Sequence, residues 1–229
     1  MELRLLQTVL ERRSFATRLS EVRAMRGAGF GETQRSVIGE VHVAFGKLYG
    51  LYDERGRAPD EMIGGFAMHD LAMFSQSYPK PDLTHLPPEK VFECGELWAV
   101  VAGAGRLLRH AGAIIADALE ARAMLVYPIF KPWNLSGSYK NFVRAGESIE
   151  WPYARTLDGG KIYVQAMVSE GEALAAGIAE AKRYNYELLD GEMGLRFDAP
   201  FAISSKRIAA RDRTIIVENS DEIAKRAAA

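Results

Sequence analysis

The chain is poor in the residues from which disulfide frameworks and metal centres are built. Its 229 residues include a single cysteine, Cys94, so no disulfide forms within the chain and a reducing compartment is expected. The histidines are scattered without the spacing of metal ligands (His42, His69, His85 and His110). We therefore expect no metal site and a cytoplasmic protein.

The chain also lacks an excess of either charge and any long hydrophobic run. Its 29 Lys and Arg residues against 30 Asp and Glu give a formal net charge of -1, which argues against a general nucleic-acid binder. No run of about 18 apolar residues occurs, so no membrane-spanning helix is expected. The first residues carry acids early and do not have the pattern of a signal peptide. A composition of 48% hydrophobic and 26% charged residues is typical of a globular protein.

The most informative stretch runs from residue 92 to residue 146. Its pattern predicts a strand, a glycine-rich turn, a long helix, an apolar strand and an Asn-capped helix, at 92–100, 101–105, 106–123, 124–130 and 134–146. A glycine turn between a strand and a helix exposes amides at the positive end of the helix, which suits a phosphate-bearing cofactor. The alternative is a tight turn that needs glycine only for its backbone angles.

The flanking regions predict helices and hairpins. Residues 2–26 have helical character, with Leu6, Leu10, Val22 and Met25 among six arginines, and are interpreted as a surface helix, or alternatively as an arginine-rich partner face. Strands are expected within 36–52 and at 62–69. The four prolines of residues 75–90 indicate an irregular loop, interpreted as a lid or as the rim of an active site.

The C-terminal third continues with a hairpin and a further helix. Strands at 150–156 and 161–168 flank the turn signal L-D-G-G. Ser169 and Glu172 fit a capping box, and Leu174, Ile178, Ala181 and Leu188 are expected on one helical stripe. A strand is predicted at 214–217.

In this order, the elements resemble those of the GNAT acyltransferase superfamily across residues 35–170. Four motifs carry the resemblance: the hairpin L-Y-G-L-Y-D-E-R-G to M-I-G-G-F, E-L-W-A-V with its glycine loop and helix, N-L-S-G-S-Y-K-N-F-V-R-A-G, and the L-D-G-G-K hairpin. The resemblance implies an α/β (α+β) fold with a mixed, mostly antiparallel central sheet flanked by helices. It also implies an acyltransferase domain at 1–170, including the N-terminal helix, and a helix and strand extension at 171–229 packed on the core.

Two positions depart from the family pattern. The family's phosphate loop, Arg/Gln-x-x-Gly-x-Gly/Ala, has no clean match; the letters around Arg109 leave too short a helix, so Gly103 to Arg106 is the favoured loop. A Tyr often precedes the glycine of the family's Asn-to-Gly helix by four residues, and Phe142 stands there. Tyr139 is the substitute candidate for the acid.

The resemblance implies a set of residues that bind the acyl donor: Trp98, Ala99, Val100, Gly103, Ala104, Gly105, Arg106, Arg109 and Asn134. Arg106 and Arg109 are expected either to pair with phosphates or to face solvent. Asn134 is expected as a helix N-cap, with pantetheine contact as the alternative. A strand amide near Trp98 to Val100 is the expected donor to the reacting carbonyl oxygen.

Glu96 is the candidate for proton removal from the acceptor amine. An ideal strand places Phe92, Cys94, Glu96, Trp98 and Val100 on one face, where apolar neighbours would raise the pKa of Glu96 toward that of a useful base. The alternatives are a local bulge that turns Glu96 to solvent, or a structural ion pair. Glu93 points the other way and is the weaker candidate, and Cys94 is expected to be an inert buried thiol.

The resemblance implies an N-acyltransferase that moves an acyl group, in the simplest case acetyl, from acyl-CoA to the amine of a small molecule, amino acid or peptide. One alternative is a long-chain N-acyl amino acid synthase or acyl-homoserine-lactone synthase relative that takes its donor from an acyl-carrier protein. Another is a catalytically degenerate module that senses acyl-CoA, and a third is an unrelated α/β protein. A homodimer is possible on this basis, and no nucleic-acid or membrane partner is expected.

Overall fold

The computed structural model describes residues 1–25, 28–29, 46–53, 61–72, 81–101, 103–128, 139–156, 159–184, 186–189 and 194–197. These residues form one sheet of ten strands, which are β1 (Glu2–Leu5), β2 (Ala28–Gly29), β3 (Lys47–Tyr52), β4 (Met62–Asp70), β5 (Val91–Ala99), β6 (Ala123–Val126), β7 (Val143–Thr156), β8 (Lys161–Glu170), β9 (Tyr186–Leu189) and β10 (Gly194–Phe197). The strand order is β2-β7-β8-β6-β5-β4-β3-β1-β10-β9. Only the β5–β6 pair is parallel among the pairs of the described strands.

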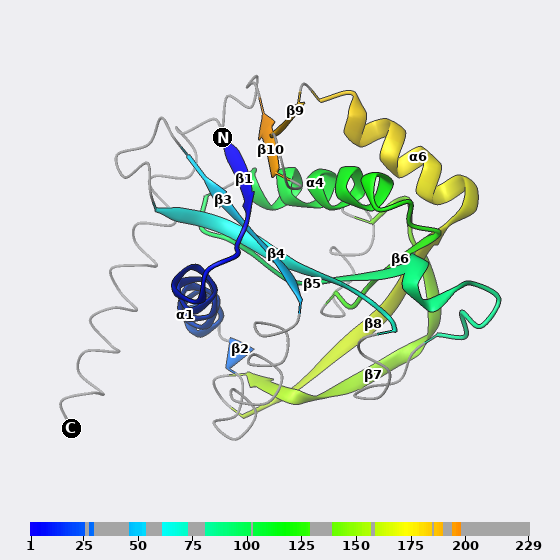
Figure 1. Cartoon of the computed structure of the whole chain (residues 1–229). Coiled ribbons are helices and arrows are strands. Elements are labelled where there is room, and N and C mark those ends of the chain that lie inside the picture. The colour runs from blue at the N-terminus through cyan, green and yellow to red at the C-terminus, as the bar shows by residue number, and fades with distance from the viewer. Residues whose placement is uncertain are drawn as a thin grey trace.

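Helices cover both faces of this sheet (Figure 1). Helix α4 (Ala104–Ala118) makes the crossover between the parallel strands, and α6 (Gly171–Lys182) packs beside it. The apolar residues of α4 recur every three or four positions and are buried against the sheet (Leu107, Leu108, Ala111, Ile114 and Ile115). A single 3-10 turn, η1 (Pro88–Lys90), leads into β5.

Helix α1 (Val9–Met25) lies on the opposite face. Phe15, Leu19 and Val22 are buried there, and the ring of Phe15 meets that of Trp98 edge-on at 5.9 Å between centroids. A capping box fixes the start of this helix: Thr8 Oγ1 accepts from the Glu11 amide, and the Glu11 carboxylate accepts from the Thr8 amide. Leu10, expected in the apolar set, is 78% exposed because it lies on the outer side of the helix.

Strands β5 and β6 separate soon after they begin to pair. Their register covers Val91–Ala123, Phe92–Met124 and Glu93–Leu125, after which β4 is the only described strand that pairs with β5 as it continues to Ala99. We call the point of divergence, at the Glu93–Leu125 pair, the fork. The fork opens the sheet next to α4.

A β-bulge interrupts β5 beyond the fork. Gly65 pairs with Trp98 and Ala67 with Gly95, so β5 carries one residue more than β4 between these pairs. Glu96 has a φ of 54°, in the left-handed region. The bulge reverses the alternation of side chains, and Trp98 therefore faces α1 while Cys94 faces α4. The expectation that Cys94 and Trp98 share a face was wrong for this reason.

The predicted fold class and most of the predicted elements are confirmed. The strand, turn, helix and parallel strand of residues 91–126, the β3–β4 hairpin and the β7–β8 hairpin all form. The expected helix at 134–146 was wrong over its described part, because 139–142 form a turn and β7 begins at Val143, opposite Val168 of β8. Its residues 134–138 and the predicted strand at 214–217 lie outside the described residues.

Two local predictions in the C-terminal third were also wrong. Ser169 does not cap a helix, because it remains in β8 opposite Met124, and α6 begins at Gly171 without a side-chain cap. Leu188 lies in β9, 58% exposed, rather than on the stripe of Leu174 and Ala181. Beyond residue 170, α6 packs on α4, and β9 and β10 extend the sheet beside β1.

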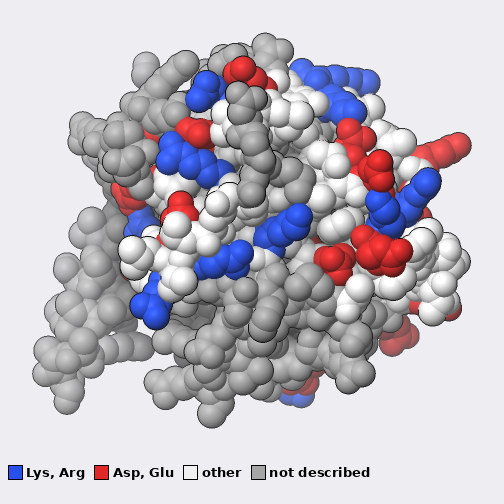
Figure 2. Space-filling view, in the orientation of Figure 1, with Lys and Arg blue, Asp and Glu red and all other residues white. Residues whose placement is uncertain are grey.

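Basic and acidic side chains alternate in small groups on the described part of the face drawn in Figure 2. No helix of the described ranges combines the length and the apolar character needed to span a bilayer. Within the same ranges, no three His, Cys, Asp or Glu side chains converge as a metal would require.

Candidate active site

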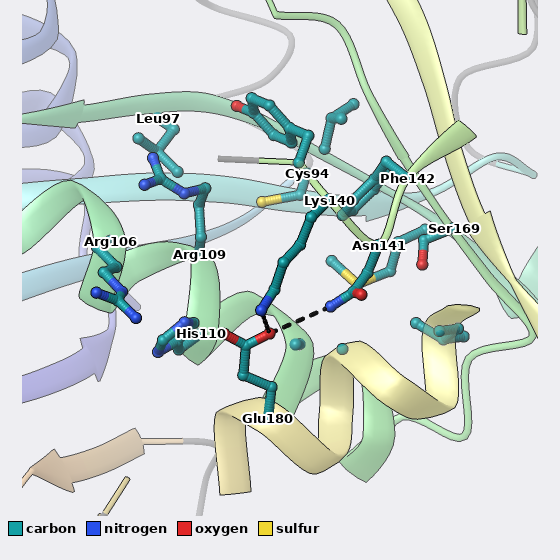
Figure 3. A pocket seen from close by; sticks show the side chains of 16 residues that line it. Cys94, Leu97, Arg106, Arg109, His110, Lys140, Asn141, Phe142, Ser169 and Glu180 are labelled. Carbon is teal, nitrogen blue, oxygen red and sulfur yellow. Dashed lines mark hydrogen bonds and ion pairs between the residues drawn. The ribbon is translucent and has the colours of Figure 1, made fainter. Parts of the chain in front are cut away.

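A pocket of about 420 Å³ lies on the α4 side of the sheet, between β5, β6, α4, α6 and the turn at residues 139–142 (Figure 3). Its volume is within the usual range for small-molecule sites. Most of its wall is apolar, from Cys94, Leu97, Ala113, Met124, Val126, Phe142 and Leu174. The polar remainder combines Arg106, Arg109, His110 and Lys140 with Tyr139, Asn141, Ser169 and Glu180. We call this cavity the donor pocket.

Arg109 is the least compensated charge of the donor pocket. Its guanidinium lies over the Tyr139 ring at 5.9 Å, and it makes no hydrogen bond or ion pair with any described residue. Burial lowers the pKa of Arg109, opposed by Tyr139. A Cβ added to Gly105 would lie 4.0 Å from Nη1 of Arg109, so the guanidinium reaches back along α4 to its first turn. A desolvated guanidinium without a carboxylate is costly unless an anion joins it.

The first turn of α4 begins at a glycine in a left-handed conformation. Gly103 has a φ of 82° and no side chain to cap the helix, and its carbonyl accepts from the amides of Arg106 and Leu107. A turn does precede the helix, as predicted, but the helix begins two residues earlier than expected: Gly103 is its N-cap, and Ala104 and Gly105 already belong to α4. The positive end of the helix and the Arg109 guanidinium meet here, an arrangement that favours an anion.

Arg106 and His110 lie one helical turn apart and share a partner. Nη2 of Arg106 donates to the Tyr184 hydroxyl at 2.7 Å, and the His110 ring lies on the Tyr184 ring at 4.2 Å between centroids. Burial, followed by the nearby Arg106 charge, lowers the pKa of His110 to about 4. His110 is therefore neutral at pH 7.

The turn at residues 139–142 forms the wall opposite α4. The Phe142 amide donates to the Tyr139 carbonyl at 2.9 Å, and their rings meet edge-on at 5.6 Å. Lys140 pairs with Glu180 of α6 at 2.7 Å (Figure 3). Burial raises the pKa of Tyr139, although Arg109 opposes the shift, so its hydroxyl keeps its proton throughout the neutral range.

The structure brings several of the predicted residues together and separates others. Arg106, Arg109 and Tyr139 all line the donor pocket, and the short turn before α4 lies beside it. Trp98 instead packs on Phe15 on the opposite face. The amide of Val100 donates to the Ile63 carbonyl at 2.9 Å, which corrects its expected role as a splayed donor. Asn134 lies outside the described residues.

Glu96 does not line the donor pocket, whereas its neighbours Cys94 and Leu97 do. It stands half-buried at the bulge, one of the alternatives considered from the sequence. Burial, followed by the charge of Glu93, raises the pKa of Cys94 to about 12, as expected of an inert thiol.

Sequence reasoning missed His110, Lys140 and Glu180 as parts of the site. The spacing of Arg106, Arg109 and His110, at i, i+3 and i+4, places all three on one helical face and was a readable signal. The Lys140–Glu180 ion pair joins segments 40 residues apart, so the local sequence around either residue could not predict it.

No family model matches the sequence, and no curated protein matches it. Among solved structures, FeeM, an N-acyl amino acid synthase from uncultured soil microbes, matches 81% of this chain and 99% of its own at 10% identity, with a TM-score of 0.56. The structure of yncA, assigned as an acetyltransferase, from Salmonella typhimurium with its cofactor acetyl-CoA matches 73% of this chain and 92% of its own at 11% identity and TM-score 0.48. A protein assigned as a GNAT-family acetyltransferase from Desulfovibrio desulfuricans matches 74% of this chain and 99% of its own at 12% identity, with a TM-score of 0.46.

Only the first TM-score is above one half, and at 10% identity it shows a shared fold rather than a shared activity. The mostly antiparallel sheet, its single described parallel pair and the crossover helix between those two strands agree with that likeness. The described part of this chain has the fold of the GNAT acyltransferases.

Proposed function

We propose that this protein is an N-acyltransferase that transfers an acyl group from acyl-CoA to an amine by direct attack. The observation that carries the proposal is the Arg109 guanidinium, desolvated in the donor pocket beside the first turn of α4 without an anionic partner in the described residues. A diphosphate at that turn would supply the missing negative charge. The apolar remainder of the pocket then suits the pantetheine arm and the acyl group.

The chemistry requires stabilisation of the carbonyl oxygen and of the leaving thiolate. Because of the bulge, Leu97 is not paired in the register between β4 and β5, and its side chain lines the donor pocket. The Leu97 amide is therefore our candidate donor to the carbonyl oxygen of the thioester. Tyr139 is our candidate acid for the thiolate, because its raised pKa keeps the hydroxyl protonated. Two carboxylates of β5 can take the amine proton, Glu96 at the bulge and Glu93 at the fork.

A donor carried by an acyl-carrier protein is a second candidate. It shares the phosphopantetheine chemistry of coenzyme A, and the largely apolar wall of the donor pocket and the fold shared with an N-acyl amino acid synthase favour it. The experiments below therefore compare a short with a long acyl chain, and coenzyme A with an acyl-carrier protein as the carrier.

The test begins with binding. The full-length chain is heated with coenzyme A, acetyl-CoA, octanoyl-CoA or S-acetylpantetheine, since a ligand that binds only the folded state raises the midpoint of unfolding. We expect a rise with the CoA esters that exceeds the rise with S-acetylpantetheine. No rise with any of them would refute the proposal.

Thiol release then separates an enzyme from a sensor. Acetyl-CoA, octanoyl-CoA and an octanoyl acyl-carrier protein are offered with the twenty amino acids and their amides as acceptors, and free thiol is followed over time. Release that depends on an amine establishes acyl transfer. Binding without release, with every donor and acceptor, would contradict it and leave the sensor alternative.

A further inference from the structure

A tyrosine that follows α6 holds an arginine of the first turn of α4. Nη2 of Arg106 donates to the Tyr184 hydroxyl at 2.7 Å, and the guanidinium carbon lies 5.7 Å from the centre of the Tyr184 ring. The Tyr184 amide in turn donates to the Ala181 carbonyl at 3.1 Å, which ties this residue to the end of α6. We call Arg106, His110 and Tyr184 the α4–α6 corner.

The α4–α6 corner is continuous with the donor pocket. Arg106 and His110 both line that pocket (Figure 3), and the His110 ring lies on the Tyr184 ring at 4.2 Å between centroids. Arg106 is exposed, whereas His110 and Tyr184 are half-buried. The corner therefore lies where the donor pocket meets solvent.

The charge of Arg106 has no carboxylate partner among the described residues. The acids of α4 and α6 that form ion pairs there do so with other cations: Glu180 pairs with Lys140 at 2.7 Å, and Asp117 pairs with Lys182 at 2.6 Å. The printed partner of Arg106 is the neutral Tyr184, which orients the guanidinium without neutralising it. Such a group is prepared for an anion.

Arg106 and Arg109 reach to two sides of the first turn of α4. Arg109 lies over the ring of Tyr139, in the turn at residues 139–142, whereas Arg106 lies against Tyr184 beyond α6. Figure 3 shows the two side chains leaving α4 in different directions. This turn is thus flanked by two cations that have no carboxylate partner in the described part of the chain, an arrangement that suits a ligand with two separate phosphate groups.

The bond from Tyr184 lowers the cost of using an exposed arginine. A long, exposed side chain loses rotamer freedom when it binds, and a side chain already held in one place loses less of it. Arg106 uses one of the five N–H donors of a guanidinium for Tyr184, so four remain for a ligand.

We propose that the α4–α6 corner binds the 3′-phosphate of coenzyme A, with Arg106 as the binding residue and Tyr184 as the residue that positions it. The inference rests on the proposed function and selects coenzyme A, rather than an acyl-carrier protein, as the carrier of the acyl group. Coenzyme A has a diphosphate and a separate phosphate monoester on its ribose. The arm of a carrier protein has a single phosphodiester and leaves Arg106 without an anion.

The decisive comparison is between coenzyme A and 3′-dephospho-coenzyme A, which differ by this one phosphate. In calorimetric titrations of the full-length chain at low salt, we expect the wild type to bind coenzyme A about 10-fold more tightly. A hydrogen bond to a charged group corresponds to about 10- to 100-fold in Kd, and an exposed arginine belongs at the lower end. Arg106→Met should bring the two affinities within threefold, and its affinity for 3′-dephospho-coenzyme A should stay within threefold of wild type.

Tyr184→Phe tests the positioning role and Arg122→Met is the control. Phenylalanine keeps the ring on His110 and removes the hydroxyl that holds Arg106, so the preference for coenzyme A should fall by about threefold without a change for 3′-dephospho-coenzyme A. A purely structural role of Tyr184 would change both affinities alike. Arg122→Met removes an exposed charge beyond the other end of α4 and should leave the preference as in the wild type.

The results separate this site from the proposed function. No binding of coenzyme A by the wild type refutes the proposed function itself. Binding of coenzyme A and 3′-dephospho-coenzyme A within twofold of each other overturns only the 3′-phosphate site, and is the result expected for a carrier-protein donor. A preference that survives in Arg106→Met, or that falls equally in Arg122→Met, also overturns it. Should Arg106→Met not fold, the wild-type preference must shrink in high salt, and a preference that salt leaves unchanged would overturn the site.

Discussion

Replacing Arg109 by Met should separate the stability of the free protein from its affinity for the donor. In the free state the guanidinium is desolvated, and among the described residues it lies over the Tyr139 ring and reaches back to the first turn of α4 at Gly105. Methionine keeps the apolar stem and removes the charge. We therefore expect the unliganded Arg109→Met protein to unfold at the same or a higher temperature, while its donor affinity falls.

The loss of affinity follows from the interaction that Met cannot make. A hydrogen bond to a charged group contributes about 1.5–3 kcal/mol, and about 1.4 kcal/mol corresponds to a tenfold change in Kd. Arg109→Met should therefore weaken coenzyme A binding by about 10- to 100-fold. The loss should shrink in high salt, because Debye screening weakens the same attraction in the wild type.

Calorimetric titration measures this effect with two ligands and a matched control. Acetyl-CoA carries the phosphates and S-acetylpantetheine does not, so the penalty should appear only with acetyl-CoA. Arg122→Met makes the same change at an exposed position beyond the other end of α4 and should leave both affinities unaltered. An Arg109→Met protein that binds acetyl-CoA within twofold of wild type, or that loses both ligands equally, would refute the reasoning.

Three further outcomes are expected. Tyr139→Phe should lower kcat by about 100-fold with unchanged donor affinity, since a thiolate needs less help than other leaving groups, and equal loss of affinity would point to packing instead. Because the pKa of His110 in the folded protein is about 4, the free energy of unfolding should fall as the pH falls from about 6.5 to about 4, where only the unfolded imidazole gains a proton. In denaturant titrations at pH 7 and pH 5, His110→Phe should remove this part of the pH dependence. An equal change in the free energy of unfolding between the two pH values in both proteins would contradict it. Gly65→Ala should destabilise the protein by about 1–3 kcal/mol, because the new Cβ would lie 2.5 Å from the Tyr49 carbonyl and 2.7 Å from the Phe15 ring. An unchanged unfolding midpoint would contradict this expectation, because both β3 and α1 would then have to shift without cost.

Local patterns were enough to predict the frame of the site. The alternation and glycine punctuation of residues 91–126 encode a strand, a turn, a helix and a strand without long-range help. The L-D-G-G turn likewise encodes its own hairpin, with Gly159 at a φ of 83°. The position of Arg109 in the helix that follows the glycine turn followed from the same pattern.

The remaining features depend on partners distant in sequence. The bulge at Glu96 exists only in the register with Gly65 and Ala67, and it decides which side chains of β5 face α4. Val143 belongs to a strand because Val168 pairs with it, although its local sequence resembles a helix. Glu93 was expected to point away from the donor side, but its pairing with His69 of β4 depends on the register between β4 and β5 and could not be predicted from the local sequence.

Amide hydrogen exchange with and without acetyl-CoA locates the bound donor on the chain and so tests whether it occupies the donor pocket. We expect slower exchange at residues 103–108 and 139–142, which border the donor pocket, with little change in α1. Slowed exchange confined to α1 and the face around Trp98, or no change in either region at saturating acetyl-CoA, would contradict it.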